Sequence, residues 1–133
     1  MVKEKKLKNV TFLPLQPKAN MPKIVASMDA AIIPLKKLQL FEGALPSKMF
    51  ETLSAEVPII MAVKGEAERL INNAQAGIVA EPENPVEIAA AVIKLYNDKE
   101  LRNKLGMNGR NYVKEHYDRN IITRNLEKIL KQL

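Results

Sequence analysis

The sequence of 133 residues has no cysteine and no tryptophan, and His116 is its single histidine. The lack of cysteine excludes disulfides and thiolate metal sites. One histidine cannot form a metal site built from several histidines. We therefore expect no metal ion and no other cofactor, and we expect His116 to be a surface residue rather than a catalytic acid or base. A chain without cysteine also fits a reducing compartment such as the cytoplasm.

Long apolar runs are missing as well. No segment approaches the roughly 20 apolar residues that a transmembrane helix requires. The N-terminal residues MVKEKKLKNV are basic, but no apolar region follows them, so they do not resemble a secretory signal. We predict a cytoplasmic chain, with a peripheral position at the inner face of the membrane as one alternative.

Aromatic residues make up only 5% of the chain, although its net charge is +6. Proteins that bind single-stranded nucleic acid combine positive charge with aromatic side chains on which the bases stack. Because this chain has so few aromatic side chains, we predict no nucleic-acid partner. Weak association with an anionic membrane surface stays open.

What the sequence does contain is a regular alternation of apolar and amphipathic segments. Short apolar runs predict four strands, and segments with a helical period predict six helices. Strands covered on both faces belong to parallel sheets with crossover helices. We therefore predict one α/β domain over 1–133, a Rossmann-like doubly wound parallel sheet with a helical C-terminal tail. The predicted strands are 10–15, 30–35, 58–63 and 77–81, and the predicted helices are 20–29, 46–56, 65–75, 84–98, 99–117 and 119–133.

The segment LPSKMFETLSAEVPII, residues 45–60, places polar residues just ahead of a buried strand. On its helix Ser47, Lys48 and Glu51 share one arc, and apolar residues occupy the opposite arc. Pro46 suits the first helical position. The free backbone N–H groups, the positive end of the helix dipole and the Lys48 ammonium together predict an anion site suited to phosphate. Glu51, one turn further on, is suited to accept hydrogen bonds from a sugar diol, as acidic residues do in dinucleotide sites.

The spacing of these residues leaves a simpler interpretation open. Lys48 and Glu51 stand at positions i and i+3, which is also the spacing of a common solvent-exposed pair. Ligands of doubly wound sheets bind at the carboxyl ends of the strands. The loops over 14–20, 34–46 and 63–66 are therefore the ones expected to border a site.

A wider pattern agrees with the phosphate interpretation. The segments PSKMFETLSAEVPII, GEAERLINNAQAGIVAEPENPVEIAAAVIKLYND and LRNKLGMNGRNYV follow one another in order. Together they resemble the C-terminal, donor-binding half of GT-B fold glycosyltransferases of group 1, or family 4, from about Val10 to the C-terminus. The resemblance implies transfer of a sugar from a nucleotide-sugar donor, with a UDP-linked donor favoured. It further implies a metal-independent, retaining reaction, in polysaccharide or glycolipid biosynthesis.

The resemblance also implies roles for individual residues. Glu51 matches the family residue that holds the ribose of the donor, and Lys48, with Ser47 beside it, lies near the diphosphate. The turn after the third predicted strand, 58–63, abuts the donor. The loop before the first predicted helix, 20–29, lies toward the base. The residues implied there are Gly65, Glu66 and Ala67 for the turn, and Leu15 and Gln16 for the base side.

Three departures from the family pattern stand out. Many members carry a second glutamate eight residues before the position of Glu51, where this chain has Gly43, with Glu42 one residue away. The glycine expected two residues before Pro58 is Glu56, which would be strained if that position needs a positive φ. The strand and glycine-rich turn that open the complete half-domain are missing, and so is the N-terminal half.

We therefore expect the chain alone to bind a donor with little or no turnover, and to work with an N-terminal half in cis or in trans. An open sheet edge and an uncovered last helix are expected, and the edge predicts a homodimer as one arrangement. One alternative is a non-catalytic nucleotide or sugar-nucleotide binding module. The other is a small flavodoxin-like regulatory domain, although the acidic cluster of such domains is missing. Asn108, Gly109 and Arg110 predict a helix break, and the three tyrosines predict helix packing.

Overall fold

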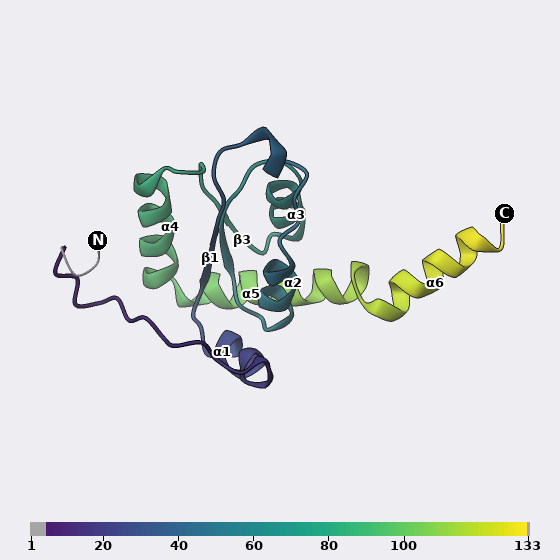
Figure 1. The fold of residues 1–133 in the computed structure, drawn as a ribbon, viewed down its shortest axis with the longest axis horizontal. Helices are drawn as coiled ribbons and strands as arrows, with labels where there is room; N and C mark the ends of the chain where they lie inside the picture. Colours follow the sequence, from purple (N-terminus) through teal and green to yellow (C-terminus); the bar gives the residue numbers. More distant parts are fainter. Residues whose placement is uncertain (1–4, 133) are drawn as a thin grey trace.

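The computed structural model describes residues 5–132, which form an α/β domain around a three-stranded parallel sheet (Figure 1). The strands are β1 (Ala31–Pro34), β2 (Ile59–Ala62) and β3 (Gly77–Val79), in the order β1-β2-β3. All four residues of β2 are buried, as expected for the central strand of a sheet covered on both faces. The sheet is parallel as predicted, but it has three strands rather than four.

Helices cover both faces of the sheet. On one face, α2 and α3 pack through a core that includes Met49, Leu53 and Ile71, and on the other face α4 packs on Ile60 through Leu95. Each predicted helix is present, with ends that differ by at most three residues from the prediction. The helices are α1 (Met21–Ala26), α2 (Ser47–Ser54), α3 (Glu66–Ala74), α4 (Pro85–Asn97), α5 (Lys99–His116) and α6 (Arg119–Leu130), with the short 3-10 helices η1 (Lys18–Asn20) and η2 (Gln39–Phe41).

The predicted strand over 10–15 is wrong. This segment is extended but pairs with no strand, and its apolar residues are exposed, Phe12 to 79% and Leu15 to 100%. A strand requires a neighbour to satisfy its backbone groups. The apolar composition of 10–15 predicted a strand, but within residues 5–132 no strand pairs with this segment.

The prediction that β1 is covered on both faces is also wrong. Ile33 is buried, but Ile32, on the opposite face, is 48% exposed. Within residues 5–132, β1 pairs only with β2, so its other edge is open. This open edge confirms the expectation of an uncovered sheet edge.

The predicted helix break at residues 108–110 is a third correction, because α5 is continuous through it. Its glycines instead permit close packing. A Cβ atom on Gly106 would lie 2.1 Å from the carbonyl oxygen of Glu56, and one on Gly109 would lie 2.7 Å from Leu53 Cδ2. Small residues thus let α5 approach the end of α2.

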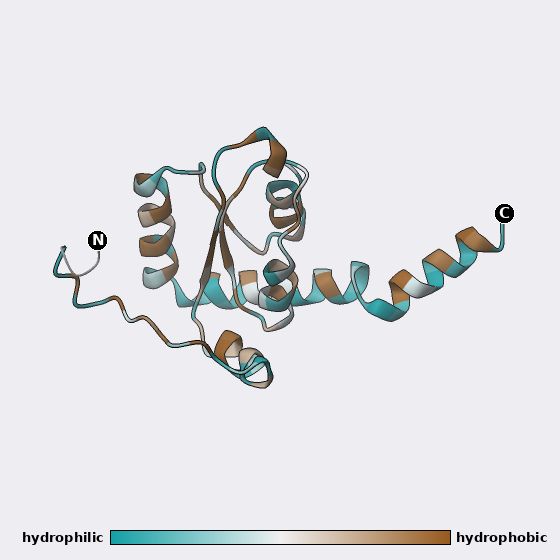
Figure 2. Cartoon of the chain, in the orientation of Figure 1, coloured by the Kyte–Doolittle hydropathy of each residue, from teal (hydrophilic) through white to brown (hydrophobic). Residues whose placement is uncertain are grey.

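The C-terminal helix α6 projects away from the rest of the domain (Figure 1). Its apolar stripe is visible in Figure 2, and the described residues leave it uncovered, as predicted. The exposed apolar residues are Ile122, Leu126, Ile129 and Leu130. Tyr112 and Tyr117 pack as predicted, with Tyr117 against Phe50 at a ring distance of 4.8 Å, but Tyr96 is 81% exposed and does not.

Candidate functional site

The N-terminus of α2 lies at the carboxyl edge of the sheet, because α2 follows β1. Pro46 stands just before the first helical residue, one position earlier than predicted, with an extended ψ of 123°. No side chain caps this end of the helix. The backbone N–H groups of Ser47 and Lys48 donate to no residue between 5 and 132, so they are available to a ligand.

The two faces of α2 are divided as the helical wheel predicted. Met49 and Leu53 are completely buried, and Ser47, Lys48 and Glu51 are exposed. Lys48 and Glu51 form no ion pair with each other, whereas Lys64 and Glu68 one loop away do, at 3.2 Å. Within the described part of the chain, the three polar side chains of this arc have no hydrogen-bond partner. The simple solvent-exposed pair is therefore not formed.

The turn at Gly65 is held against the loop that leads into α2. The Glu66 N–H donates to the Glu42 carbonyl oxygen at 2.7 Å. Gly65 has a φ of 85°, and a Cβ there would lie 2.0 Å from the same oxygen. Glycine is therefore required at this position by its neighbour Glu42 as well as by its backbone conformation. The loops over 34–46 and 63–66 meet here, as expected for loops at the same edge of a parallel sheet.

The other two residues predicted for this turn, Glu66 and Ala67, differ in their exposure to solvent. Glu66 is exposed and pairs with Arg69. Ala67 is completely buried in the core, so only its backbone N–H can face a ligand. Glu68, which was not singled out from the sequence, reaches back to the Gly65 N–H at 3.4 Å and helps to cap α3.

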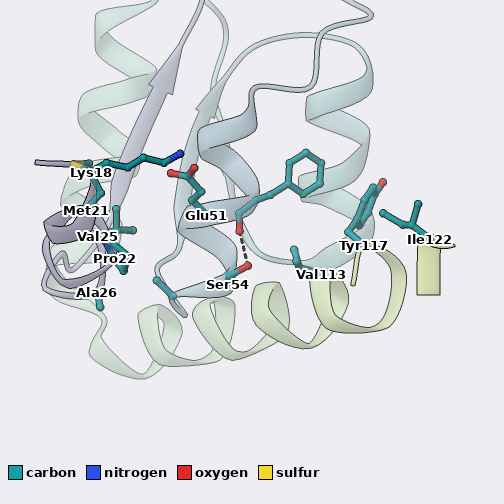
Figure 3. A pocket seen from close by; sticks show the side chains of 12 residues that line it. Lys18, Met21, Pro22, Val25, Ala26, Glu51, Ser54, Val113, Tyr117 and Ile122 are labelled. Carbon is teal, nitrogen blue, oxygen red and sulfur yellow. Dashed lines mark hydrogen bonds between the residues drawn. The ribbon is translucent and has the colours of Figure 1, made fainter. Parts of the chain in front are cut away.

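The two residues predicted for the base side lie on the extended segment before η1. Leu15 is fully exposed, and the Gln16 Nε2 donates to the Pro14 carbonyl at 3.0 Å. The structure instead brings Lys18 and Met21 to a groove that also contains Glu51 (Figure 3). The sequence pointed to the loop over 14–20, but nothing in it distinguished Lys18.

An ion-pair cluster missed by sequence reasoning joins the loops after the three strands. Glu81 pairs with Lys37 at 2.7 Å and with Lys64 at 3.0 Å. The hydrogen bond from Lys37, and then that from Lys64, lowers the pKa of the Glu81 carboxyl. The hydrogen bonds to Glu81 and Glu68 raise the pKa of Lys64. The cluster ties the loops together beside the N-terminus of α3.

The predicted strain at Glu56 is confirmed, because its φ is 61°. The Glu56 N–H donates to the Leu53 carbonyl and the Val57 N–H donates to the Thr52 carbonyl, which is the Schellman pattern that ends a helix. Glycine is the usual residue at this position. The Glu56 carboxylate accepts a hydrogen bond from Arg110 at 2.8 Å, which joins α2 to α5.

Comparison with known proteins decides the family. The family model described as "Glycosyl transferases group 1" matches residues 1–112. The chain belongs to the group 1 glycosyltransferases. An uncharacterized glycosyltransferase of Methanocaldococcus jannaschii is 25% identical over 91 residues, which are 68% of this chain and 23% of that protein.

Two solved structures show the same fold. Sucrose-phosphate synthase from Thermosynechococcus elongatus matches with a TM-score of 0.83 and 18% identity, over 98% of this chain and 32% of that one. The C-terminal domain of a glycosyl transferase group 1 family protein from Francisella tularensis matches with a TM-score of 0.70 and 21% identity, over 89% of this chain and 59% of that one. The fold is therefore that of a GT-B C-terminal domain. This chain spans only part of the length of each of these three proteins.

None of the helices within residues 5–132 combines the length and the apolar character needed to cross a membrane.

Proposed function

We propose that this chain is the donor-binding part of a glycosyltransferase and that it holds a nucleotide sugar at the N-terminus of α2. The observation that carries the proposal is the arrangement on that helix. Two free backbone N–H groups and the exposed Lys48 ammonium stand at its start, and the unpaired Glu51 carboxylate follows one turn later on the same face. A UDP-linked donor is the one we favour.

Each part of the donor has a matching group. The diphosphate accepts hydrogen bonds from the Ser47 and Lys48 N–H groups and lies at the positive end of the helix dipole. The Lys48 ammonium adds a full positive charge, and the Ser47 hydroxyl a further donor. The Glu51 carboxylate accepts hydrogen bonds from the ribose hydroxyls. When the bond to the sugar breaks, negative charge grows on the departing diphosphate, and the same groups stabilise it.

Sugar transfer also requires an acceptor site and exclusion of water, which we assign to a second domain. Closure of two domains around a donor removes water from the reacting centre. We propose that an N-terminal half, in the same protein or in a separate one, supplies the acceptor site, and that the acceptor belongs to polysaccharide or glycolipid biosynthesis. This chain by itself is then expected to bind the donor without transferring its sugar.

Calorimetric titration of the chain with UDP, GDP and ADP tests the proposal. We expect micromolar to millimolar dissociation constants for at least one nucleotide. Lys48→Ala and Glu51→Ala are each expected to weaken binding about tenfold, as for the loss of a charged hydrogen bond. Lys94→Ala on α4, which covers the other face of the sheet, is the matched control and should leave binding unchanged. Equal affinities in all variants would show that the donor does not bind at α2.

A second candidate, a non-catalytic nucleotide-binding module, is favoured by the surroundings of Gly43. A Cβ at Gly43 would meet nothing within 4 Å, and this position carries no carboxylate. The Glu42 carbonyl oxygen accepts a hydrogen bond from the Glu66 N–H, and this bond holds Glu42 one residue away from the position of the missing carboxylate. Measurement of sugar transfer after addition of a matching N-terminal half separates the two candidates, because only a donor-binding half of an enzyme would then show turnover.

A further inference from the structure

The ion-pair cluster around Glu81 spans the carboxyl edge of the whole sheet. Lys37 follows β1, Lys64 follows β2 and Glu81 follows β3, and β2 lies between the other two strands. One oxygen of the Glu81 carboxylate lies 2.7 Å from the Lys37 ammonium, and the other lies 3.0 Å from the Lys64 ammonium. Glu81 therefore links the loops that follow β1 and β3 across the end of the central strand, although β1 and β3 are not neighbours in the sheet.

We propose that Glu81 is a positioning residue of the donor site, which holds Lys37 and Lys64 so that the loop over 34–46 and the turn at Gly65 keep the arrangement that binds the donor. The inference rests on the proposed function, because it takes the start of α2 and this turn as the parts that contact the donor. It goes further by naming a residue outside those contacts, on the loop after β3, on which the donor affinity depends.

The loop after β3 is itself anchored to the first turn of α4. The Glu81 N–H donates to one oxygen of the Glu87 carboxylate at 2.8 Å, and the Asn84 side-chain amide donates to the other oxygen at 2.7 Å. Pro82, between Glu81 and this cap, is buried. The Glu81 carboxylate therefore extends from a backbone that is fixed on both sides.

Lys37 joins the loop over 34–46 to this anchored segment at two points. Besides the ion pair with Glu81, the Lys37 backbone N–H donates to the Glu83 carboxylate at 3.1 Å. From Lys37 the chain continues to Glu42, whose carbonyl accepts the hydrogen bond from the Glu66 N–H, and then to Pro46 at the start of α2. The position of Lys37 therefore influences the helix start that carries the proposed phosphate contacts.

Lys64 joins the turn at Gly65 to the same carboxylate. Lys64 also pairs with one oxygen of Glu68 at 3.2 Å, and the other oxygen of Glu68 accepts the hydrogen bond from the Gly65 N–H at 3.4 Å. Without the Glu81 carboxylate, Lys64 keeps Glu68 as a partner but loses its link to Lys37. Glu81 is thus the group that connects the two donor-binding segments through side chains.

Charge and position make opposite predictions for the removal of this carboxylate. Glu81 places a negative charge at the same edge of the sheet as the proposed diphosphate site, so on charge alone its removal would strengthen the binding of an anionic ligand. Removal would also release two ammonium groups. A positioning role predicts weaker binding, because the ligand must then order the loops itself. The sign of the change in affinity therefore distinguishes the two effects.

The test is calorimetric titration of the Glu81→Gln variant of the full chain with UDP, at a temperature well below its melting transition. We expect the affinity to fall about three- to fivefold, a modest effect because the ion pairs are partly exposed. Lys37→Met is expected to weaken binding about twofold, and the double variant should bind no more weakly than Glu81→Gln, because Lys37 acts through Glu81. Glu127→Gln, which removes an ion pair with Lys131 on α6, is the matched control and should leave the affinity unchanged.

An unchanged or increased affinity in Glu81→Gln would overturn the proposal, and so would losses that simply multiply in the double variant. If Lys48→Ala and Glu51→Ala weaken binding but Glu81→Gln does not, this inference alone fails. If the wild-type chain binds no nucleotide, the proposed function fails and this inference fails with it.

A second measurement needs no ligand. In the isotope-labelled chain without nucleotide, Glu81→Gln is expected to shift the amide signals of Ser47, Gly65 and Glu66, which are distant from Glu81 in sequence, whereas Glu127→Gln should not. Signals that keep their wild-type positions at all three amides would show that Glu81 does not position these segments, and the inference would fail.

Discussion

Glu56 shows how a single residue can carry a cost that the fold tolerates. It occupies the left-handed position of the Schellman motif that ends α2, with a φ of 61°. In that conformation a residue other than glycine destabilises the folded state by about 1 kcal/mol or more. The ion pair between Glu56 and Arg110 is exposed on both sides and stabilises the folded state by at most about 1 kcal/mol.

We therefore expect Glu56→Gly to raise the free energy of unfolding by about 0.5 kcal/mol and the melting temperature by a few degrees. Thermal unfolding followed by circular dichroism measures the effect. Glu56→Ala is the control, because it removes the same ion pair but keeps a Cβ atom, and it should not stabilise the chain. An equal gain in both variants would show that charge, rather than backbone conformation, limits stability at this position.

At the scale of elements, the close approach of α5 to the end of α2 depends on Gly106. The space for its missing Cβ is filled by the Glu56 carbonyl, a backbone atom that cannot move aside alone. We expect Gly106→Ala to lower the free energy of unfolding by about 1–3 kcal/mol, the usual range for overpacking. Urea unfolding gives this value, and Gly43→Ala is the control because a Cβ there meets no atom within 4 Å. Similar stability of the two variants would contradict the packing we describe.

The helices could be predicted from the sequence because their determinants are local. Pro85 in the first turn of α4, with Asn84 capping it, and the apolar arc of α2 mark these elements without tertiary information. The arc of Ser47, Lys48 and Glu51 was predictable for the same reason. The failure at 10–15 has the opposite cause, since a strand exists only through its neighbours. Lys18 could not be predicted as a site residue, because its position beside Glu51 depends on how α1 packs against α2.

At the scale of the whole molecule, several apolar surfaces stay uncovered within residues 5–132, and two of them lie on regular elements of the fold. One is the open edge and outer face of β1 with Ile32, and the other is the stripe along α6. Unpaired strand edges associate readily with other chains. We propose that the purified chain forms a homodimer through β1.

Ile32→Lys is expected to shift the purified chain toward the monomer, because it places a charge on the exposed face of the edge strand. Sedimentation velocity at several concentrations measures this shift. Ile122→Lys on the α6 stripe is the matched control and should leave association unchanged. A monomeric wild-type chain, or a loss of association in the α6 variant alone, would contradict pairing through β1.

The central claim is that the start of α2 is the donor site, and the most direct test is titration of the isotope-labelled chain with UDP, followed by amide chemical shifts. The account predicts the largest shifts at the Ser47 and Lys48 amides, with further shifts at Glu51 and little change along α4. The shifts should disappear in the Lys48→Ala, Glu51→Ala double variant. Saturable shifts centred on another surface, with the α2 amides unmoved, would contradict the account.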